Sequence, residues 1–121
     1  MAKMIFTGSH GTENPTMATF PFIMAKTAKE LDPEAEVAIG LLGEGVNCVR
    51  KGVAKHVVTV GHGTLEEFLN FAVEKNLPIL ICGACADARG LKKEDCMGNV
   101  SWATPKTFLE YGSDADKMMS F

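Results

Sequence analysis

The stretch from Pro78 to Gly90 constrains this chain most, because it joins a buried strand directly to a helix. Residues 78–81 are apolar and typical of a short buried strand, and residues 83–90 are typical of a helix with its C-cap. Cys82 is therefore expected at the carboxyl end of a strand, with Cys85 about one helical turn further on. Ligands bind at such strand ends, and a helix start favours a thiolate. We expect Cys82 to be a reactive thiol; the alternative is a core thiol that ends the strand.

Composition narrows the class of protein. The chain has 121 residues, 46% hydrophobic and 22% charged, which is ordinary for one soluble globular domain spanning residues 1–121. The net charge of −3 provides no basic surface for nucleic acid, and no run approaches the ~18 apolar residues of a membrane span. The N-terminus lacks an apolar export segment. We therefore expect a cytoplasmic protein whose four cysteines stay reduced.

Short apolar segments alternate with amphipathic segments along the chain. Strands are expected at residues 3–7, 36–41, 78–82, 100–102 and 117–121, and helices at 17–31, 65–73, 83–89 and 105–112. Weaker patterns predict a short helix at 43–52, a strand or an irregular connector at 56–60, and a helical turn at 92–97. This alternation predicts an α/β fold, a three-layer α/β/α domain with a mainly parallel sheet.

Three helix starts carry recognisable signals. Thr64 and Glu67 have the spacing of a capping box, and the Thr104-Pro105 pair is typical of a cap followed by proline at the first helical position. Pro21 lies inside the first helical pattern. Either the helix kinks there, or Thr19 is the cap and Pro21 belongs to the first turn.

A second candidate site is the glycine-rich loop between the first strand and the first helix. Its candidate ligand-binding residues are Gly8, Ser9, His10, Gly11 and Asn14. The N–H groups of such a loop could cradle an anion, although a tight surface turn has the same composition. His62 lies between two glycines and is either a neighbour of this pocket or a loop residue.

Three stretches carry a resemblance to a known family. They are residues 6–25, with the first strand, loop and helix; Cys82 followed by small residues and then Arg89-Gly90; and the final segment 115–121. The short segment 44–46 also fits. In their order and spacing these stretches resemble the DsrE/DsrF-like family, which includes TusD-like sulfur-relay proteins.

The resemblance implies a five-stranded sheet, assembly into homotrimers or homohexamers, and a cysteine that carries sulfur as a persulfide between donor and acceptor proteins. The distance back from Arg89 matches that cysteine to Cys82. Cys85 is a departure from the TusD-like sulfur-relay proteins, because it forms a Cys-x-x-Cys pair that they lack at this place. It could resolve a persulfide on Cys82 by forming a disulfide, or it could simply pack the helix against the sheet. Arg89 could favour an anionic sulfur species, or serve the helix C-terminus or an interface.

Two classes of function stay open. The first is a cytoplasmic, sulfurtransferase-like persulfide carrier acting through Cys82, whose status as an enzyme the sequence leaves uncertain. The second is a non-catalytic oligomeric binding or thiol-redox module with an anion or small-ligand site at residues 8–14. Three cysteines and a histidine could in principle bind zinc. Such sites combine two closely spaced pairs of ligands, and this sequence lacks the second pair, a further Cys-x-x-Cys or a His-x-x-x-His. We therefore expect neither a metal nor a cofactor.

Overall fold

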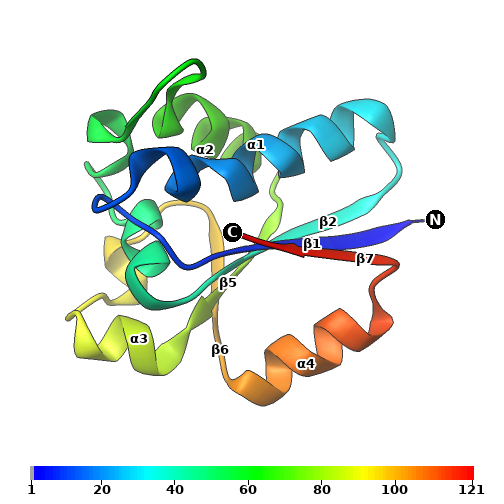
Figure 1. The fold of residues 1–121 in the computed structure, drawn as a ribbon. Helices are drawn as coiled ribbons and strands as arrows, with labels where there is room; N and C mark the ends of the chain where they lie inside the picture. Colours follow the sequence, from blue (N-terminus) through cyan, green and yellow to red (C-terminus); the bar gives the residue numbers. More distant parts are fainter. Residues whose placement is uncertain (1) are drawn as a thin grey trace.

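The computed structural model describes residues 2–121 and has one five-stranded sheet at its centre (Figure 1). All neighbouring strands are parallel, in the order β6-β5-β2-β1-β7. The strands are β1 (Lys3–Gly8), β2 (Glu36–Leu41), β5 (Pro78–Cys82), β6 (Asn99–Ala103) and β7 (Lys117–Ser120). A separate antiparallel pair is formed by β3 (Val58–Thr59) and β4 (Gly63–Thr64). The expected mainly parallel five-stranded sheet is confirmed.

Helices cover both faces of the sheet, which confirms the three-layer α/β/α architecture (Figure 1). The α-helices are α1 (Pro15–Leu31), α2 (Leu65–Glu74), α3 (Gly83–Ala88) and α4 (Pro105–Asp114). Three short 3₁₀ helices, η1 (Gly43–Val49), η2 (Ala54–His56) and η3 (Lys93–Asp95), lie in the connections.

The core is divided by the sheet into a large and a small part. The large part joins α1 and α2 to one face, with Phe22, Leu69 and Ile79 fully buried, and it includes Ala86 of α3. The small part lies under α4, where Phe108 packs against the other face. Gly40 makes room for this ring, because a Cβ there would lie 2.8 Å from a Phe108 ring carbon.

The first helix begins earlier than a Thr19 cap would allow. Asn14 is its N-cap and accepts a hydrogen bond from the Met17 N–H at 3.2 Å, and Pro15 occupies the first position. The helix continues through Pro21 to Leu31. The Thr19 alternative is therefore wrong.

The other helix-end predictions met different outcomes. Thr104 caps α4 by accepting from the Thr107 N–H, as predicted, but the helix runs to Asp114 rather than ending at residue 112. Thr64 precedes α2, yet its side chain makes no capping hydrogen bond, so the predicted capping box does not form. Gly90 follows α3 with φ of +63°, the left-handed conformation that favours glycine after a helix.

The helix predicted at residues 43–52 is a 3₁₀ helix, more tightly wound than an α-helix, and it ends at Val49. Glycines let this segment approach the loop after β1. A Cβ on Gly45 would collide with the Gly8 carbonyl oxygen, and a Cβ on Gly11 would meet the Glu44 carbonyl oxygen. The backbone of η1 is therefore in direct contact with the end of β1 and the loop that follows it.

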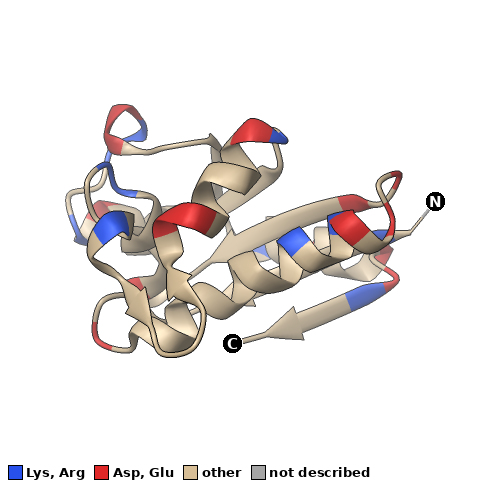
Figure 2. Cartoon of the chain, turned by 90° about the horizontal axis from the view of Figure 1, so that it is seen from above, with Lys and Arg blue, Asp and Glu red and all other residues tan. Residues whose placement is uncertain are grey.

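In the cartoon of Figure 2, positions with Lys or Arg are interspersed with positions that carry Asp or Glu. None of the helices within residues 2–121 combines the length and apolar character needed to cross a membrane.

Candidate active site

The candidate site lies at the sheet edge where β2 and β5 end. Because these strands are parallel neighbours, their carboxyl ends bring η1 and α3 together. Cys82 is the last residue of β5 and the N-cap of α3, and Cys85 lies in the first turn of α3. The predicted placement of both cysteines is confirmed. Both are free thiols with half-buried side chains.

The sulfur of Cys85 accepts a hydrogen bond from a backbone donor. The backbone N–H of Gly43 donates to Cys85 Sγ at 3.2 Å, and the side chain of Cys82 also acts on the pKa of this thiol. Gly43 opens η1 with φ of +51°, a conformation that favours glycine. The turn after β2 therefore supplies a fixed donor to a cysteine on α3.

These contacts separate the acidities of the two thiols. The pKa of Cys85 is lowered, first by the hydrogen bond from Cys82 and then by the Gly43 N–H and the Arg89 charge, against the opposing effect of burial. The pKa of Cys82 is raised, first by burial and then by the proton that it shares with Cys85. Backbone N–H groups of residues 84 and 85 favour a Cys82 thiolate but are outweighed.

The predicted effect of the helix start on Cys82 is opposed by burial, which raises the pKa of this thiol. The helix begins where predicted, but it has only six residues and its N–H groups are a minor influence. Of the two thiols, Cys85 is the one whose contacts favour the thiolate.

Arg89 extends from the end of α3 back over the site. Its Nη1 donates to the Cys85 carbonyl oxygen at 3.1 Å, and its Nε and Nη2 both donate to Glu44 Oε1, at 2.9 and 2.6 Å. Glu44 in turn raises the pKa of Arg89. Arg89 thus binds a carbonyl group of α3 and also places a positive charge near the Cys85 sulfur. Both arrangements were among the roles predicted for it, at the helix C-terminus and beside an anionic sulfur.

The glycine-rich loop after β1 is filled by its own carboxylate. Glu13 Oε2 lies 3.0 Å from His10 Nδ1, and Glu13 Oε1 accepts from the Gly11 N–H. These hydrogen bonds lower the pKa of Glu13. Asn14 is used as the helix cap, and the Ser9 N–H donates to the Phe121 carbonyl oxygen at 3.0 Å. The Ser9 and Gly11 N–H groups, the His10 ring and the Asn14 side chain thus already have partners within the chain.

His62 lies in an aromatic cluster that adjoins the glycine-rich loop. Its ring packs edge-on against Phe20, with ring centroids 5.7 Å apart, and Phe20 stacks on Phe121 at 5.9 Å. Its ring contacts thus link it to α1 and to the chain end beyond β7. Through Phe121 this cluster adjoins Ser9, while the thiol pair lies at the end of β5.

The remaining cysteines have environments that suppress reactivity. Cys48 is buried and donates to the His10 carbonyl oxygen, and burial raises its pKa to about 12. Burial also raises the pKa of Cys96. In the part of the chain that the structure describes, no three His, Cys, Asp or Glu side chains gather as a metal site would require.

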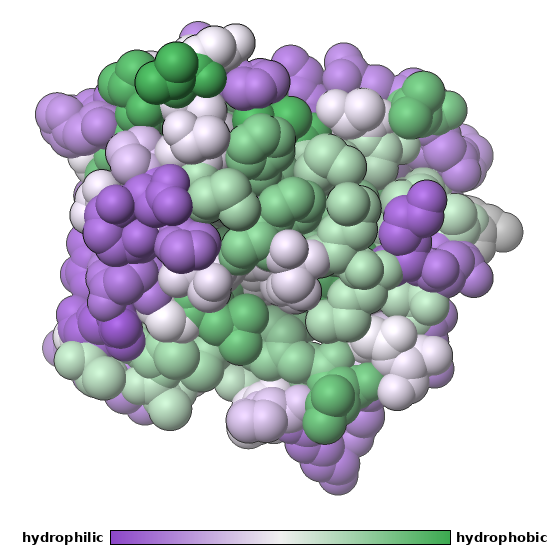
Figure 3. Space-filling model, viewed as in Figure 1, coloured by the Kyte–Doolittle hydropathy of each residue, from purple (hydrophilic) through white to green (hydrophobic). Residues whose placement is uncertain are grey.

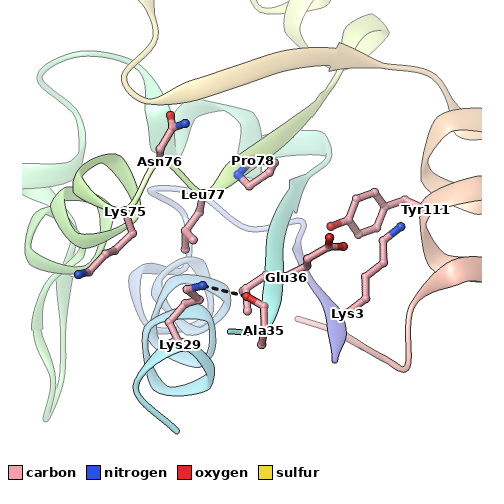
Figure 4. A pocket seen from close by; sticks show the side chains of 10 residues that line it. Lys3, Lys29, Ala35, Glu36, Lys75, Asn76, Leu77, Pro78 and Tyr111 are labelled. Atoms are coloured by element: carbon pink, nitrogen blue, oxygen red, sulfur yellow. Dashed lines mark hydrogen bonds between the residues drawn. The ribbon is translucent and has the colours of Figure 1, made fainter. Parts of the chain in front are cut away.

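A separate hollow of about 460 Å³ lies at the amino ends of β1, β2 and β5, on the edge opposite the thiols (Figure 4). Three lysines line it. Lys29 Nζ donates to the carbonyl oxygens of Pro33 and Ala35, and Lys3 Nζ lies 4.3 Å from the centre of the Tyr111 ring. Lys75 Nζ lies 5.9 Å from the centre of the Phe71 ring, so all three cations already have partners within the protein.

Sequence patterns pointed to Cys82, Cys85 and Arg89 but not to Gly43 or Glu44 as parts of this site. A signal was present: the Gly-x-Gly spacing of residues 43–45 directly after a strand is typical of a turn that brings its backbone close to another group. What that group would be depends on the order of strands in the sheet.

Comparisons with known proteins agree on the family and the fold. The model of the DsrE/DsrF-like family matches residues 2–121. The uncharacterized protein MJ0989 of Methanocaldococcus jannaschii is 31% identical over 86 residues, which cover 71% of this chain and 72% of the relative. The uncharacterized protein MK0008 of Methanopyrus kandleri is 30% identical, over 71% of this chain and 68% of the relative.

Two solved structures share the fold over their full length and that of this chain. The ychN protein from E. coli superposes with a TM-score of 0.83 at 19% identity. Protein MTH1491 from Methanobacterium thermoautotrophicum, described as of unknown function, superposes with a TM-score of 0.66 at 12% identity.

Proposed function

Because the chain belongs to the DsrE/DsrF-like family, we propose that it is a cytoplasmic sulfur-relay protein that carries sulfur as a persulfide at the Cys82–Cys85 pair. Sulfur donor and acceptor proteins are its proposed partners. The observation that best supports this function is the surroundings of Cys85 Sγ, which accepts the Gly43 N–H at 3.2 Å and lies beside Arg89. Reactive cysteines characteristically occupy such electropositive and partly exposed positions.

The proposed loading step begins at Cys85. Its thiolate attacks the outer sulfur of a donor persulfide, the S–S bond of the donor breaks, and the donor leaves as a thiolate with the electron pair of that bond. Cys85 keeps the outer sulfur and its proton, so charge and atoms balance without an oxidant. An acceptor thiolate then attacks the outer sulfur and regenerates the Cys85 thiolate.

Cys82 has a second role in this proposal. The sequence resemblance placed the carrier position at Cys82, whereas the hydrogen bonds of the site favour Cys85 as the first acceptor. Cys82 donates the hydrogen bond that favours the Cys85 thiolate. It also lies within reach of the loaded sulfur and provides a second thiol for its transfer.

Loading can be tested with a low-molecular-weight alkyl persulfide followed by alkylation and peptide mass spectrometry. One added sulfur atom is expected on Cys85 in the wild type. The adduct should disappear in Cys85→Ser and persist in the control Cys48→Ser. An adduct that appears on Cys82 first and is unchanged in Cys85→Ser would overturn the order of the thiols. Its absence from both thiols would overturn the carrier function.

The binding-module alternative receives less support. A free anion at residues 8–14 would have to displace the Glu13 carboxylate from the Gly11 N–H and from His10. The function proposed here therefore lies with the thiol pair rather than with the loop.

We also propose that the protein forms homo-oligomers, as the family resemblance implies. The support is the outer edge of β7, where Met118 and Met119 are 49% and 36% exposed and Met119 lines an apolar groove against α1. Figure 3 shows hydrophobic residues gathered over the face on which β7 lies. Light scattering should give a mass above that of one chain, and Met119→Lys should lower it. A monomeric wild type would contradict the proposal.

A further inference from the structure

A closed ring of hydrogen bonds among four residues joins η1 and the residue after it to the end of α3. Glu44 Oε1 accepts two hydrogen bonds from Arg89, and Glu44 Oε2 accepts from Asn47 Nδ2 at 3.4 Å. Asn47 Oδ1 accepts from Nε and Nη2 of Arg50, both at 3.3 Å. Arg50 Nη2 then donates to the Arg89 carbonyl oxygen at 2.9 Å, which completes the ring.

We propose that Glu44 is a positioning residue that holds the Arg89 guanidinium beside Cys85 and thereby sets the reactivity of that thiol. This inference rests on the proposed function of the thiol pair. It assigns a task to a side chain that makes no hydrogen bond to either sulfur.

The geometry of the ring gives the first argument. An arginine side chain is long and flexible, so its charge has a definite place only where several of its N–H groups have partners. Nη1 of Arg89 is held by the Cys85 carbonyl oxygen, while Nε and Nη2 converge on one oxygen of Glu44. Without Glu44, two of these three bonds are lost and the guanidinium is free to move into solvent.

The weakness of the pair as a source of stability gives the second argument. The side chains of Arg89 and Glu44 are 30% and 47% exposed, so solvent screens their ion pair and it contributes little to folding stability. The main consequence of the ion pair is therefore the position of the Arg89 charge, and not a gain in folding stability. Glu44 also directly follows Gly43, whose N–H bonds the same sulfur, so one short segment sets both contacts.

Two possible effects of Glu44 on Cys85 have opposite signs. A carboxylate acting through its own negative charge would disfavour the thiolate, so its removal would speed alkylation of Cys85. A carboxylate acting by holding Arg89 favours the thiolate, so its removal would slow alkylation. The sign of the change therefore distinguishes positioning from a simple charge effect.

The experiment measures the alkylation rate of Cys85 by iodoacetamide from pH 5 to 10, resolved by peptide mass spectrometry. Wild type, Glu44→Ala, Arg89→Ala and the double variant are compared. Glu44→Ala is expected to slow the reaction about threefold at pH 7 and to move the pH midpoint upward, since rate changes about threefold for each pKa unit once nucleophilicity is included. In the Arg89→Ala background, Glu44→Ala should no longer slow the reaction.

Two further variants guard the interpretation. Glu44→Gln keeps an oxygen that can accept a hydrogen bond from Arg89, so its Cys85 should react at least as fast as in the wild type. This variant can also be measured if Glu44→Ala fails to fold. Glu74→Ala makes the same change in net charge at the end of α2 and should leave the rate unchanged.

The inference is overturned if Glu44→Ala reacts as fast as the wild type or faster. It is also overturned if Glu44→Ala slows the reaction equally with and without Arg89. This experiment uses no sulfur donor, so it tests the role of Glu44 separately from the persulfide function. A negative alkylation result would not contradict persulfide loading of wild-type Cys85. A failure of loading would not change the alkylation profile.

Discussion

The backbone N–H of Gly43 donates a hydrogen bond to the sulfur of Cys85 at 3.2 Å, across 42 residues of sequence. This contact is possible because β2 and β5 are neighbours and end at the same sheet edge. A fixed backbone donor needs no rearrangement when the sulfur becomes charged, so it favours the thiolate at little cost. The reactivity of this site is thus linked to the turn after β2 as well as to the helix that carries the cysteine.

Cys85 is expected to be the first cysteine modified by iodoacetamide at pH 7. Its hydrogen-bond donors lower its pKa, whereas burial raises the pKa values of Cys82, Cys48 and Cys96. Time-resolved peptide mass spectrometry should show the order directly, with Cys48 the slowest. Modification of Cys82 ahead of Cys85 would contradict this assignment.

Removal of the Cys82 thiol should raise the pKa of Cys85, because the hydrogen bond from Cys82 is the largest influence that lowers it. Cys82→Ala is expected to slow alkylation of Cys85 about threefold at pH 7. Cys82→Ser retains a donor of similar size and should remain close to the wild type. Equal rates in the alanine and serine variants would show that the donor at position 82 has no such effect.

Gly45→Ala should destabilise the protein, because its Cβ would collide with the backbone oxygen of Gly8, which has little freedom to move. Overpacking of this kind costs about 1–3 kcal/mol, measured as the free energy of unfolding in urea. Gly112→Ala is the matched control. Its Cβ meets only the flexible end of Met118, and alanine favours a helix by up to about 1 kcal/mol, so stability should stay level or rise. Comparable losses in both variants would argue against the backbone contact.

Glu13 should make folding stability fall in acid. Hydrogen bonds from the Gly11 N–H and His10 lower its pKa in the folded protein below the ordinary value of 4.5. A lowered folded pKa means that this stabilisation is present above the unfolded pKa and is lost as pH falls through the folded one. Urea unfolding at pH 6 and pH 3 should show a smaller acid loss in Glu13→Gln than in the wild type. Identical losses would mean that Glu13 makes no such contribution.

Local sequence was sufficient for the elements that carry the site. The apolar run before Cys82, the break at Gly83 and the C-terminal Gly90 predicted the strand, the helix and its end where the structure has them. Backbone conformation depends mostly on near neighbours, and alternation of strands and helices is enough to indicate a parallel sheet. The capping box at Thr64 failed because spacing alone does not ensure that a side chain makes its hydrogen bond.

What the sequence by itself determined is the fold class, the family resemblance and the place of the two cysteines at the end of a strand. Only the tertiary structure decided which of them is favoured as a thiolate. Cys85 accepts an N–H from residue 43 and lies near a guanidinium held by residue 44, and neither residue is near it in the chain. The charge of a thiol depends on every donor and charge around it, and the order of strands brings those groups together.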